Sequence, residues 1–185
     1  LADIEAHGGH FTTGFVGTKD LLVALSKVGR EDVAYRLLKN RTYPSWLFSI
    51  EHGATSIWER WDGWTPEKGF QDPGMNSFAH YSFGSVAQWM FENIGGIGLA
   101  APGYARLRLA PRPGGGLTHA RARYDSIRGP IEVAWKLADG VLTLEVEVPP
   151  NVGATLVIPT RAPGSVTEGG RPFAQGGEGR GRRMA

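Results

Sequence analysis

The sequence predicts a multidomain protein, α then β, in which helical hairpins are followed by an antiparallel β-sandwich. Apolar residues recur at helical spacing in the first half of the chain, whereas they alternate with polar residues beyond Ile97. The helical half alone is too short to close a hydrophobic core. We therefore expect incomplete helical hairpins over residues 1–97, the sandwich over 98–160, and a disordered tail rich in glycine and arginine over 161–185.

Two helices joined by a short link are predicted close to the N-terminus. Thr18 is suited to cap the first helix, and Gly29 is suited to end it. The second helix is expected over residues 30–40, and so short a link makes the pair an antiparallel hairpin. A shorter apolar run follows over 43–48. The apolar side chains that define the two helices are Leu21, Leu22, Leu25 and Val28 in the first, and Val33, Leu37 and Leu38 in the second.

The next stretch, residues 51–75, is rich in glycine, tryptophan, aspartate and proline. This composition predicts an irregular loop, and long irregular loops in compact domains are often functional. A further helix is expected over 76–93. Asn76 or Ser77 is suited to cap it, and the glycines that follow residue 94 end it.

Five strands are expected in the second half of the chain. Within residues 131–137, alternation places Ile131, Val133, Trp135 and Leu137 on one face. The dipeptide 139–140, Asp-Gly, between two alternating runs indicates a tight hairpin turn. The five expected strands cover residues 104–109, 119–124, 131–137, 141–148 and 154–158.

Composition excludes several classes of function. The 185 residues include no cysteine, which excludes disulfides, thiolate nucleophiles and sulfur-ligated zinc. Residues 1–97 carry 11 acidic and 8 basic side chains, whereas residues 98–185 carry 7 and 12. The pI of about 9.1 therefore reflects an arginine-rich tail and not a basic binding face. We expect no nucleic-acid partner and, without a long apolar stretch, no membrane-spanning segment.

Charged and aromatic side chains are most concentrated in residues 55–64, Thr-Ser-Ile-Trp-Glu-Arg-Trp-Asp-Gly-Trp. Aromatic faces stack on the C–H faces of sugar rings, and a carboxylate such as Glu59 acts as a general acid or base. Other interpretations are open: Glu59 pairs with Arg60 at the surface, the tryptophans form only core, and Asp62 is a turn residue before Gly63.

The histidines are weaker indications of a functional site. His80 lies in an aromatic stretch, where a histidine is more often a packed core residue, although from a helix start it can donate a hydrogen bond to a hydroxyl. His7 and His10 lack a third ligand at useful spacing. We therefore predict no metal site, and no cofactor motif is present.

Three motifs together resemble bacterial α-L-rhamnosidases of glycoside hydrolase family 78. They are Gly-His-Phe-Thr-Thr-Gly at 9–14, Gly-Ala-Thr-Ser-Ile-Trp-Glu-Arg-Trp-Asp at 53–62, and Asn-Ser-Phe-Ala-His-Tyr at 76–81. The resemblance implies that residues 1–97 are the C-terminal part of an (α/α)6 barrel, followed by that family's β-sandwich. It also implies hydrolysis of rhamnose-containing glycosides with inversion.

The resemblance also implies roles for single residues. Glu59 matches the general base, His80 matches a histidine that contacts the sugar, and Trp58 and Trp61 are expected as pocket walls. The general acid is expected in sequence before Leu1, so we predict that this chain alone is inactive. Two alternatives stay open: another inverting enzyme on an α/α barrel, and a non-catalytic carbohydrate-binding module.

Overall fold

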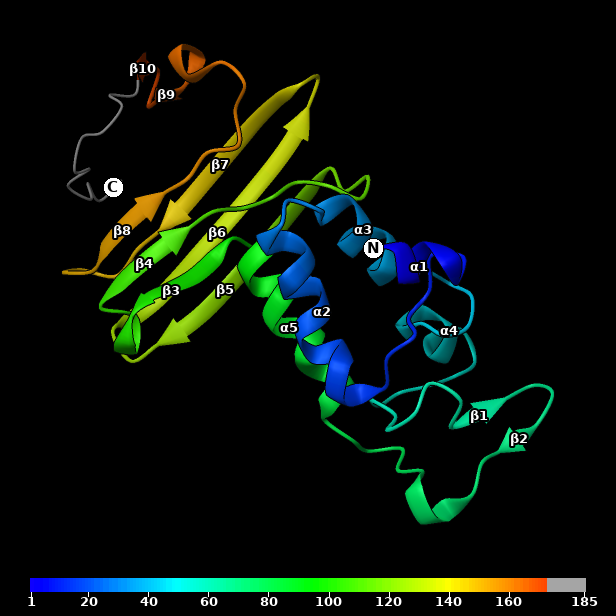
Figure 1. Cartoon of the computed structure of the whole chain (residues 1–185). Coiled ribbons are helices and arrows are strands. Elements are labelled where there is room, and N and C mark those ends of the chain that lie inside the picture. Colours follow the sequence, from blue (N-terminus) through cyan, green and yellow to red (C-terminus); the bar gives the residue numbers. More distant parts are fainter. Residues whose placement is uncertain (173–185) are drawn as a thin grey trace. The chain divides into compact units, whose positions relative to one another are not determined.

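The computed structural model describes residues 1–172 (Figure 1). They form two compact units, which are treated separately below. The first unit comprises Leu1–Met90 together with Gly114–Gly116, and the second comprises Phe91–Pro113 and the described residues from Leu117 to Pro172. The division falls shortly before the boundary that the sequence predicts at Ile97.

The first unit is helical, and its predicted hairpin is present. The helices α2 and α3 pack against each other. The start of α2 differs from the prediction, because Gly14 is its N-cap and Thr18 lies inside the helix, where its hydroxyl donates to the Gly14 carbonyl at 2.9 Å. Ser45 caps α4, since its Oγ accepts the Phe48 N–H. The bounds are α1 Ala2–Ala6, α2 Phe15–Lys27, α3 Glu31–Lys39 and α4 Trp46–Glu51.

The predicted helix over 76–93 is wrong in its first part. Residues 77–81 are irregular, because the Asn76 side chain and the Ser77 backbone are bonded to residues far away in sequence. Neither residue caps the start of the helical segment that follows; Asn76 instead ends the 3₁₀ turn Pro73–Met75. The later part contains three short turns of different pitch. They are the 3₁₀ turn Ser82–Ser85, the α-helix α5 Val86–Trp89 and the π-helical turn Met90–Ile94.

The long loop between α4 and residue 76 is largely irregular, as the sequence predicts. It contains one small antiparallel hairpin, in which Trp64 pairs with Phe70 and Thr65 with Gly69. The elements in the loop are β1 Trp64–Thr65, β2 Gly69–Phe70 and the 3₁₀ turn Pro73–Met75.

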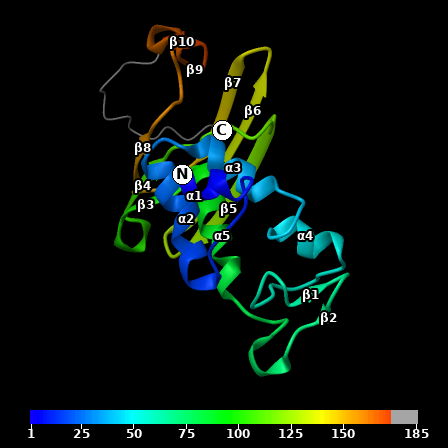
Figure 2. The ribbon, with the colours of Figure 1, turned by 45° about the vertical axis from the view of Figure 1, so that its right-hand side comes forward.

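The second unit contains two three-stranded sheets, ordered β3-β4-β8 and β5-β6-β7. Figure 2 shows their strands as separate groups. The β4 and β8 strands are parallel, so the prediction of a wholly antiparallel sandwich is wrong for this pair. The chain passes through the other sheet between them, which supplies the crossover that parallel neighbours need. The strands are β3 Ile97–Ala101, β4 Arg106–Leu109, β5 His119–Ser126, β6 Gly129–Ala138, β7 Val141–Glu147 and β8 Gly153–Leu156.

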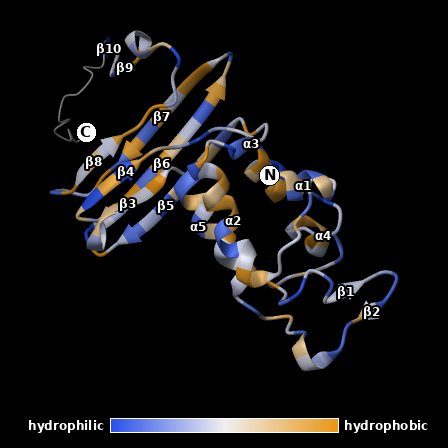
Figure 3. Ribbon diagram, in the orientation of Figure 1, coloured by the Kyte–Doolittle hydropathy of each residue, from blue (hydrophilic) through white to orange (hydrophobic). Residues whose placement is uncertain are grey.

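One apolar core joins the two sheets of the second unit. Leu107 and Leu109 come from one sheet, and Ile131 and Val133 from the other. The alternation predicted for β6 is confirmed through Trp135, whereas Leu137 is 38% exposed near the strand end. Figure 3 shows the same alternation of apolar and polar residues along the strands. The predicted Asp139-Gly140 turn is also confirmed, since both residues have positive φ, at 50° and 75°.

Residues 161–172 differ from the prediction of a disordered tail. Pro163–Ser165 form a 3₁₀ turn. Thr167–Glu168 (β9) and Arg171–Pro172 (β10) pair as an antiparallel hairpin. The rest of the predicted tail, residues 173–185, lies outside the described residues. Within residues 1–172 no helix is long and apolar enough to cross a bilayer.

Candidate active site

Two segments that are distant in sequence lie side by side in the first unit. The N–H of Glu59 donates to the carbonyl of Ser77 at 2.8 Å, and the N–H of His80 donates to the carbonyl of Ile57 at 2.8 Å. The hydroxyl of Ser56 donates to the carbonyl of Phe78. We call residues 56–59 and 77–80 the paired segments. They bring together the two sequence-predicted site residues that carry polar chemistry, one on each segment.

The carboxylate of Glu59 is held by a backbone donor of the opposite segment. The N–H of Ser77 donates to Glu59 Oε2 at 2.8 Å, so Ser77 bonds both the backbone and the side chain of Glu59. Glu59 is half-buried, and within residues 1–172 its second oxygen, Oε1, has no hydrogen-bond partner. One oxygen is therefore fixed, while the other is able to accept a proton.

His80 is held by ring contacts and by its backbone. Its imidazole lies 5.0 Å from the ring of Phe15 and 5.3 Å from that of Tyr81, measured between centroids. The N–H of Ser82 points to Nδ1 at 3.4 Å. An accepting Nδ1 places the proton of the neutral ring on Nε2, which has no partner in the described part of the chain. Nε2 is thus a hydrogen-bond donor.

Trp61 is a core residue and not an open sugar platform. Its ring stacks on Phe83 at 3.7 Å and on Phe11 at 5.2 Å, and its indole N–H donates to the Thr13 carbonyl. Only 9% of the residue is exposed. Aromatic neighbours enclose most of the ring, and Trp61 also lines the smaller hollow described below, so its place in a pocket wall stays a prediction.

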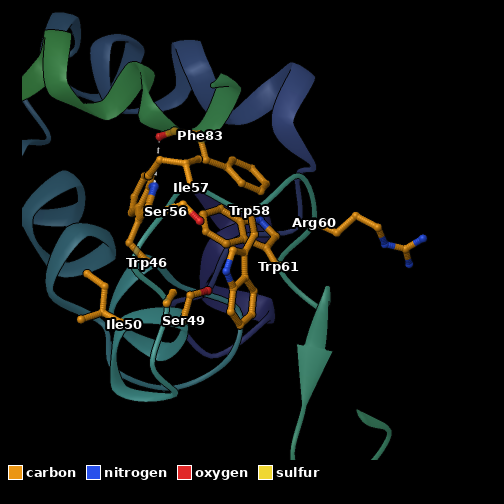
Figure 4. Close-up of a pocket in the computed structure, with 10 residues that line it drawn as sticks. Trp46, Ser49, Ile50, Ser56, Ile57, Trp58, Arg60, Trp61 and Phe83 are labelled. Carbon is orange, nitrogen blue, oxygen red and sulfur yellow. Dashed lines mark hydrogen bonds between the residues drawn. The ribbon is translucent and has the colours of Figure 1, made fainter. Parts of the chain in front are cut away.

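Trp58 lines two hollows. The smaller, of about 40 Å³, lies among Trp46, Trp61 and Phe83 (Figure 4), with the guanidinium of Arg60 pointing away from the tryptophans. The larger, of about 300 Å³, is lined by aromatic and polar side chains. Neither hollow is lined by Glu59 or His80. The lining residues of the larger hollow are His52, Gly53, Ala54, Thr55, Ser56, Trp58, Trp64, Phe70 and Phe78.

The charge of Arg60 is matched mainly by Asp62, and Glu59 contributes less. Arg60 donates two hydrogen bonds to the Asp62 carboxylate, at 2.9 and 3.0 Å. These bonds hold the pKa of Asp62 below its usual range. This ion pair is not among the features predicted from the sequence. The signal was the spacing, since the Arg-x-Asp pattern forms the same kind of pair between Arg30 and Asp32.

The contacts that Asn76 and Ser77 make are likewise not predicted from the sequence. The Asn76 amide donates to the Gly63 carbonyl, and Ser77 acts through its backbone N–H. Within residues 1–172 no group of three or more histidine, aspartate or glutamate side chains is placed to hold a metal ion.

Comparisons with known families cover the described chain in two parts. Residues 1–94 match the model of the bacterial alpha-L-rhamnosidase 6 hairpin glycosidase domain. Residues 96–172 match the model of the bacterial alpha-L-rhamnosidase C-terminal domain. The junction between the two matches lies close to the boundary that the sequence predicts.

Individual relatives agree with these matches. An alpha-L-rhamnosidase of Streptomyces avermitilis is 48% identical over 166 residues, which are 90% of this chain and 16% of that protein. The crystal structure of the Streptomyces avermitilis alpha-L-rhamnosidase complexed with L-rhamnose has a TM-score of 0.85 at 49% identity, over 88% of this chain and 16% of that one. The native enzyme from Aspergillus terreus has a TM-score of 0.81 at 39% identity, over 87% and 19%. The chain thus spans less than a fifth of the length of these relatives.

Proposed function

Because this chain belongs to the family of bacterial α-L-rhamnosidases, we propose that it is part of an inverting enzyme that hydrolyses terminal α-L-rhamnosides. In this proposal residues 1–97 supply the last hairpins of an (α/α)6 barrel, and the two sheets form the domain that follows. The chain's share of its relatives' length, 16% for the Streptomyces avermitilis protein, supports the view that the remaining hairpins lie elsewhere in a longer protein.

Glu59 is proposed as the general base. The observation that carries this assignment is its carboxylate, which has one oxygen fixed by the Ser77 N–H and the other without a partner in residues 1–172. Oε1 takes a proton from water, the water oxygen forms a bond to the anomeric carbon, and the bond from that carbon to the leaving oxygen breaks. A second carboxyl group gives its proton to the leaving oxygen.

The second carboxyl group is proposed to come from another part of the complete enzyme. Inverting chemistry needs the two carboxyl groups about 6.5–9.5 Å apart, so that water fits between them. Two acidic side chains near Glu59 in sequence are already engaged: Asp62 binds Arg60, and Glu51 pairs with Arg41. Neither is placed as a free proton donor.

His80 is proposed to bind the sugar. Its Nε2–H is suited to donate to a hydroxyl group, because Nδ1 faces the N–H of Ser82. Trp58 is proposed to help shape the substrate cleft from the side of the larger hollow. Trp61 is assigned the structural task of holding the loop that carries Glu59.

Substitution of the base tests the proposal. In the complete enzyme, Glu59→Gln is expected to lower kcat on an aryl α-L-rhamnoside about 10²–10⁴-fold. Glu51→Gln is a matched control, since it removes a carboxylate that pairs with Arg41 in the same stretch. In Glu59→Ala, added azide should restore turnover by attacking in place of activated water.

Two results would contradict the proposal. Unchanged kcat with weaker binding in Glu59→Gln would identify a sugar-binding role without catalysis. Turnover of rhamnosides by the purified 185-residue chain would refute the assignment of the general acid to another part of the enzyme.

A further inference from the structure

We propose that Asn76 is a positioning residue for Glu59. Its side-chain amide anchors the peptide group that donates to the Glu59 carboxylate. This inference rests on the proposed role of Glu59, and it assigns Asn76 no contact with the substrate.

The anchor is a hydrogen bond across the base of the β1–β2 loop. Asn76 Nδ2 donates to the carbonyl of Gly63 at 2.9 Å. The same carbonyl accepts the N–H of Gln71 at 3.1 Å. Both bonds hold the end of the loop against Gly63, the residue where the loop begins. The position of Asn76 is therefore tied to Gly63, which follows the segment that carries Glu59.

Asn76 directly precedes the donor that holds the carboxylate. The peptide group between Asn76 and Ser77 carries the N–H that donates to Glu59 Oε2. Since this peptide group is planar, its N–H direction follows the orientation of the Asn76 backbone. An anchored Asn76 side chain thus limits the rotation of the peptide group, and with it the orientation of the carboxylate.

The surroundings of Asn76 leave it little freedom. Asn76 Oδ1 is buried and has no hydrogen-bond partner in residues 1–172, an arrangement that is rare and calls for a local explanation. A Cβ atom at Gly63 would lie 2.7 Å from this oxygen. The amide is thus held closely against a glycine, and its donor, not its acceptor, makes the bonds. This pattern fits a side chain whose role is to place the neighbouring peptide group of Ser77.

Loss of the Asn76 anchor should affect turnover and not substrate binding. A carboxylate that loses its fixed oxygen rotates away from the line of attack, and small errors of placement cost much rate. The sugar contacts of the ground state do not pass through Asn76. Loss of the anchor should therefore lower kcat and leave KM nearly unchanged, whereas general unfolding would lower the amount of active enzyme.

Asn76→Asp in the complete enzyme is the direct test. It keeps the shape of the side chain but replaces the donating amide by an oxygen that faces the Gly63 carbonyl. We expect kcat to fall about 10- to 100-fold with KM within about twofold. Asn40→Asp is the matched control, because Asn40 uses its side-chain oxygen as an acceptor for Thr42, which aspartate preserves. Active-site titration with a tight inhibitor counts the folded enzyme in each variant.

A second variant decides the question if Asn76→Asp does not fold. Gly63→Ala keeps the amide but pushes it, since the new Cβ meets Asn76 Oδ1. We expect Gly63→Ala to lower kcat with KM unchanged, and to have a smaller effect in an Asn76→Ala background, where that oxygen is absent. Equal effects in both backgrounds would overturn the anchor.

The two proposals fail in distinguishable ways. If Glu59→Gln abolishes turnover but Asn76→Asp has wild-type kcat, the anchor is wrong and the base assignment stands. If Glu59→Gln itself has wild-type kcat, the proposed function is wrong. A parallel rise of KM and fall of kcat in Asn76→Asp would assign the residue to general structure and overturn the positioning role.

Discussion

The indole N–H of Trp61 donates to the backbone carbonyl of Thr13 at 3.0 Å. This bond joins the loop that carries Glu59 to the residue just before the N-cap of α2. It is part of a cluster in which Phe11 and Phe83 stack on the same indole. The backbone near Glu59 is thus fixed from the core side by an aromatic cluster.

Trp61→Phe should destabilise the chain. The substitution keeps an aromatic ring but removes the indole donor, so the Thr13 carbonyl keeps only the Thr18 hydroxyl at 3.2 Å. Loss of one hydrogen bond costs about 0.5–1.5 kcal/mol in the free energy of unfolding. Urea unfolding followed by circular dichroism measures the change. Trp64→Phe is the control, because Trp64 is only half-buried and its indole N–H has no bond to residues 1–172. An equal loss in both variants would show that the Thr13 bond is not the cause.

Gly114→Ala should also destabilise, for a steric reason. A Cβ at Gly114 would lie 2.6 Å from Cε2 of the buried Tyr35 ring. Overpacking of this kind costs about 1–3 kcal/mol. Gly153→Ala is the matched control, since no atom lies within 4 Å of its Cβ position, and its stability should stay near the wild-type value. The free energies of unfolding in urea compare the two variants.

Tyr35 should make stability fall in alkaline solution. Burial raises the pKa of its phenol from about 10 to about 12. The folded chain therefore holds this proton between pH 10 and 12, whereas the unfolded chain loses it. The contribution of the protonated Tyr35 phenol to the free energy of unfolding is present in full below about pH 10 and is lost as the pH rises through 12. Tyr35→Phe should flatten this part of the pH dependence, by about 2 kcal/mol. Absorbance of tyrosinate at 295 nm provides an independent titration.

Asp62 should contribute stability that is lost in acid. The hydrogen bonds from Arg60 lower the pKa of Asp62. The contribution is therefore present above the unfolded-state pKa of about 3.9 and disappears as the pH falls below it. Because the pair is partly exposed, we expect Asp62→Asn to cost about 0.2–1 kcal/mol at pH 7, and progressively less as the pH falls below about 3.9. A difference that does not shrink in acid would contradict this cause. Glu67→Gln controls for a change of charge in the same loop.

Elements with local signals were predicted from sequence. Val33 and Leu37 of α3 are both fully buried on the predicted face. The Asp139-Gly140 turn was predicted because few residues accept positive φ. By contrast, β3 was missed. Its sequence, Ile-Gly-Leu-Ala-Ala, lacks β-branched alternation, and it becomes a strand by pairing with β4.

The site was predicted only in part for a similar reason. Motifs in the sequence indicate Glu59 and His80, whereas the contacts of these side chains depend on residues elsewhere in the chain. The partner of the carboxylate is the backbone N–H of Ser77, a group that almost every residue has. No pattern of side chains reveals such a donor. The enclosure of Trp61 depends on Phe11 and Phe83, which are far from it in sequence.

The paired segments have a consequence for how this fold varies. Each of the two candidate site residues is bonded through its backbone to the opposite segment, Glu59 to Ser77 and His80 to Ile57. The residues between the paired segments, including the β1–β2 hairpin, begin and end next to these backbone bonds. Loop grafts of different length or sequence between Gly63 and Gln71 should therefore be tolerated, provided that both ends stay fastened. The proposed base and the proposed sugar-binding histidine should thus keep their places when the hairpin is exchanged.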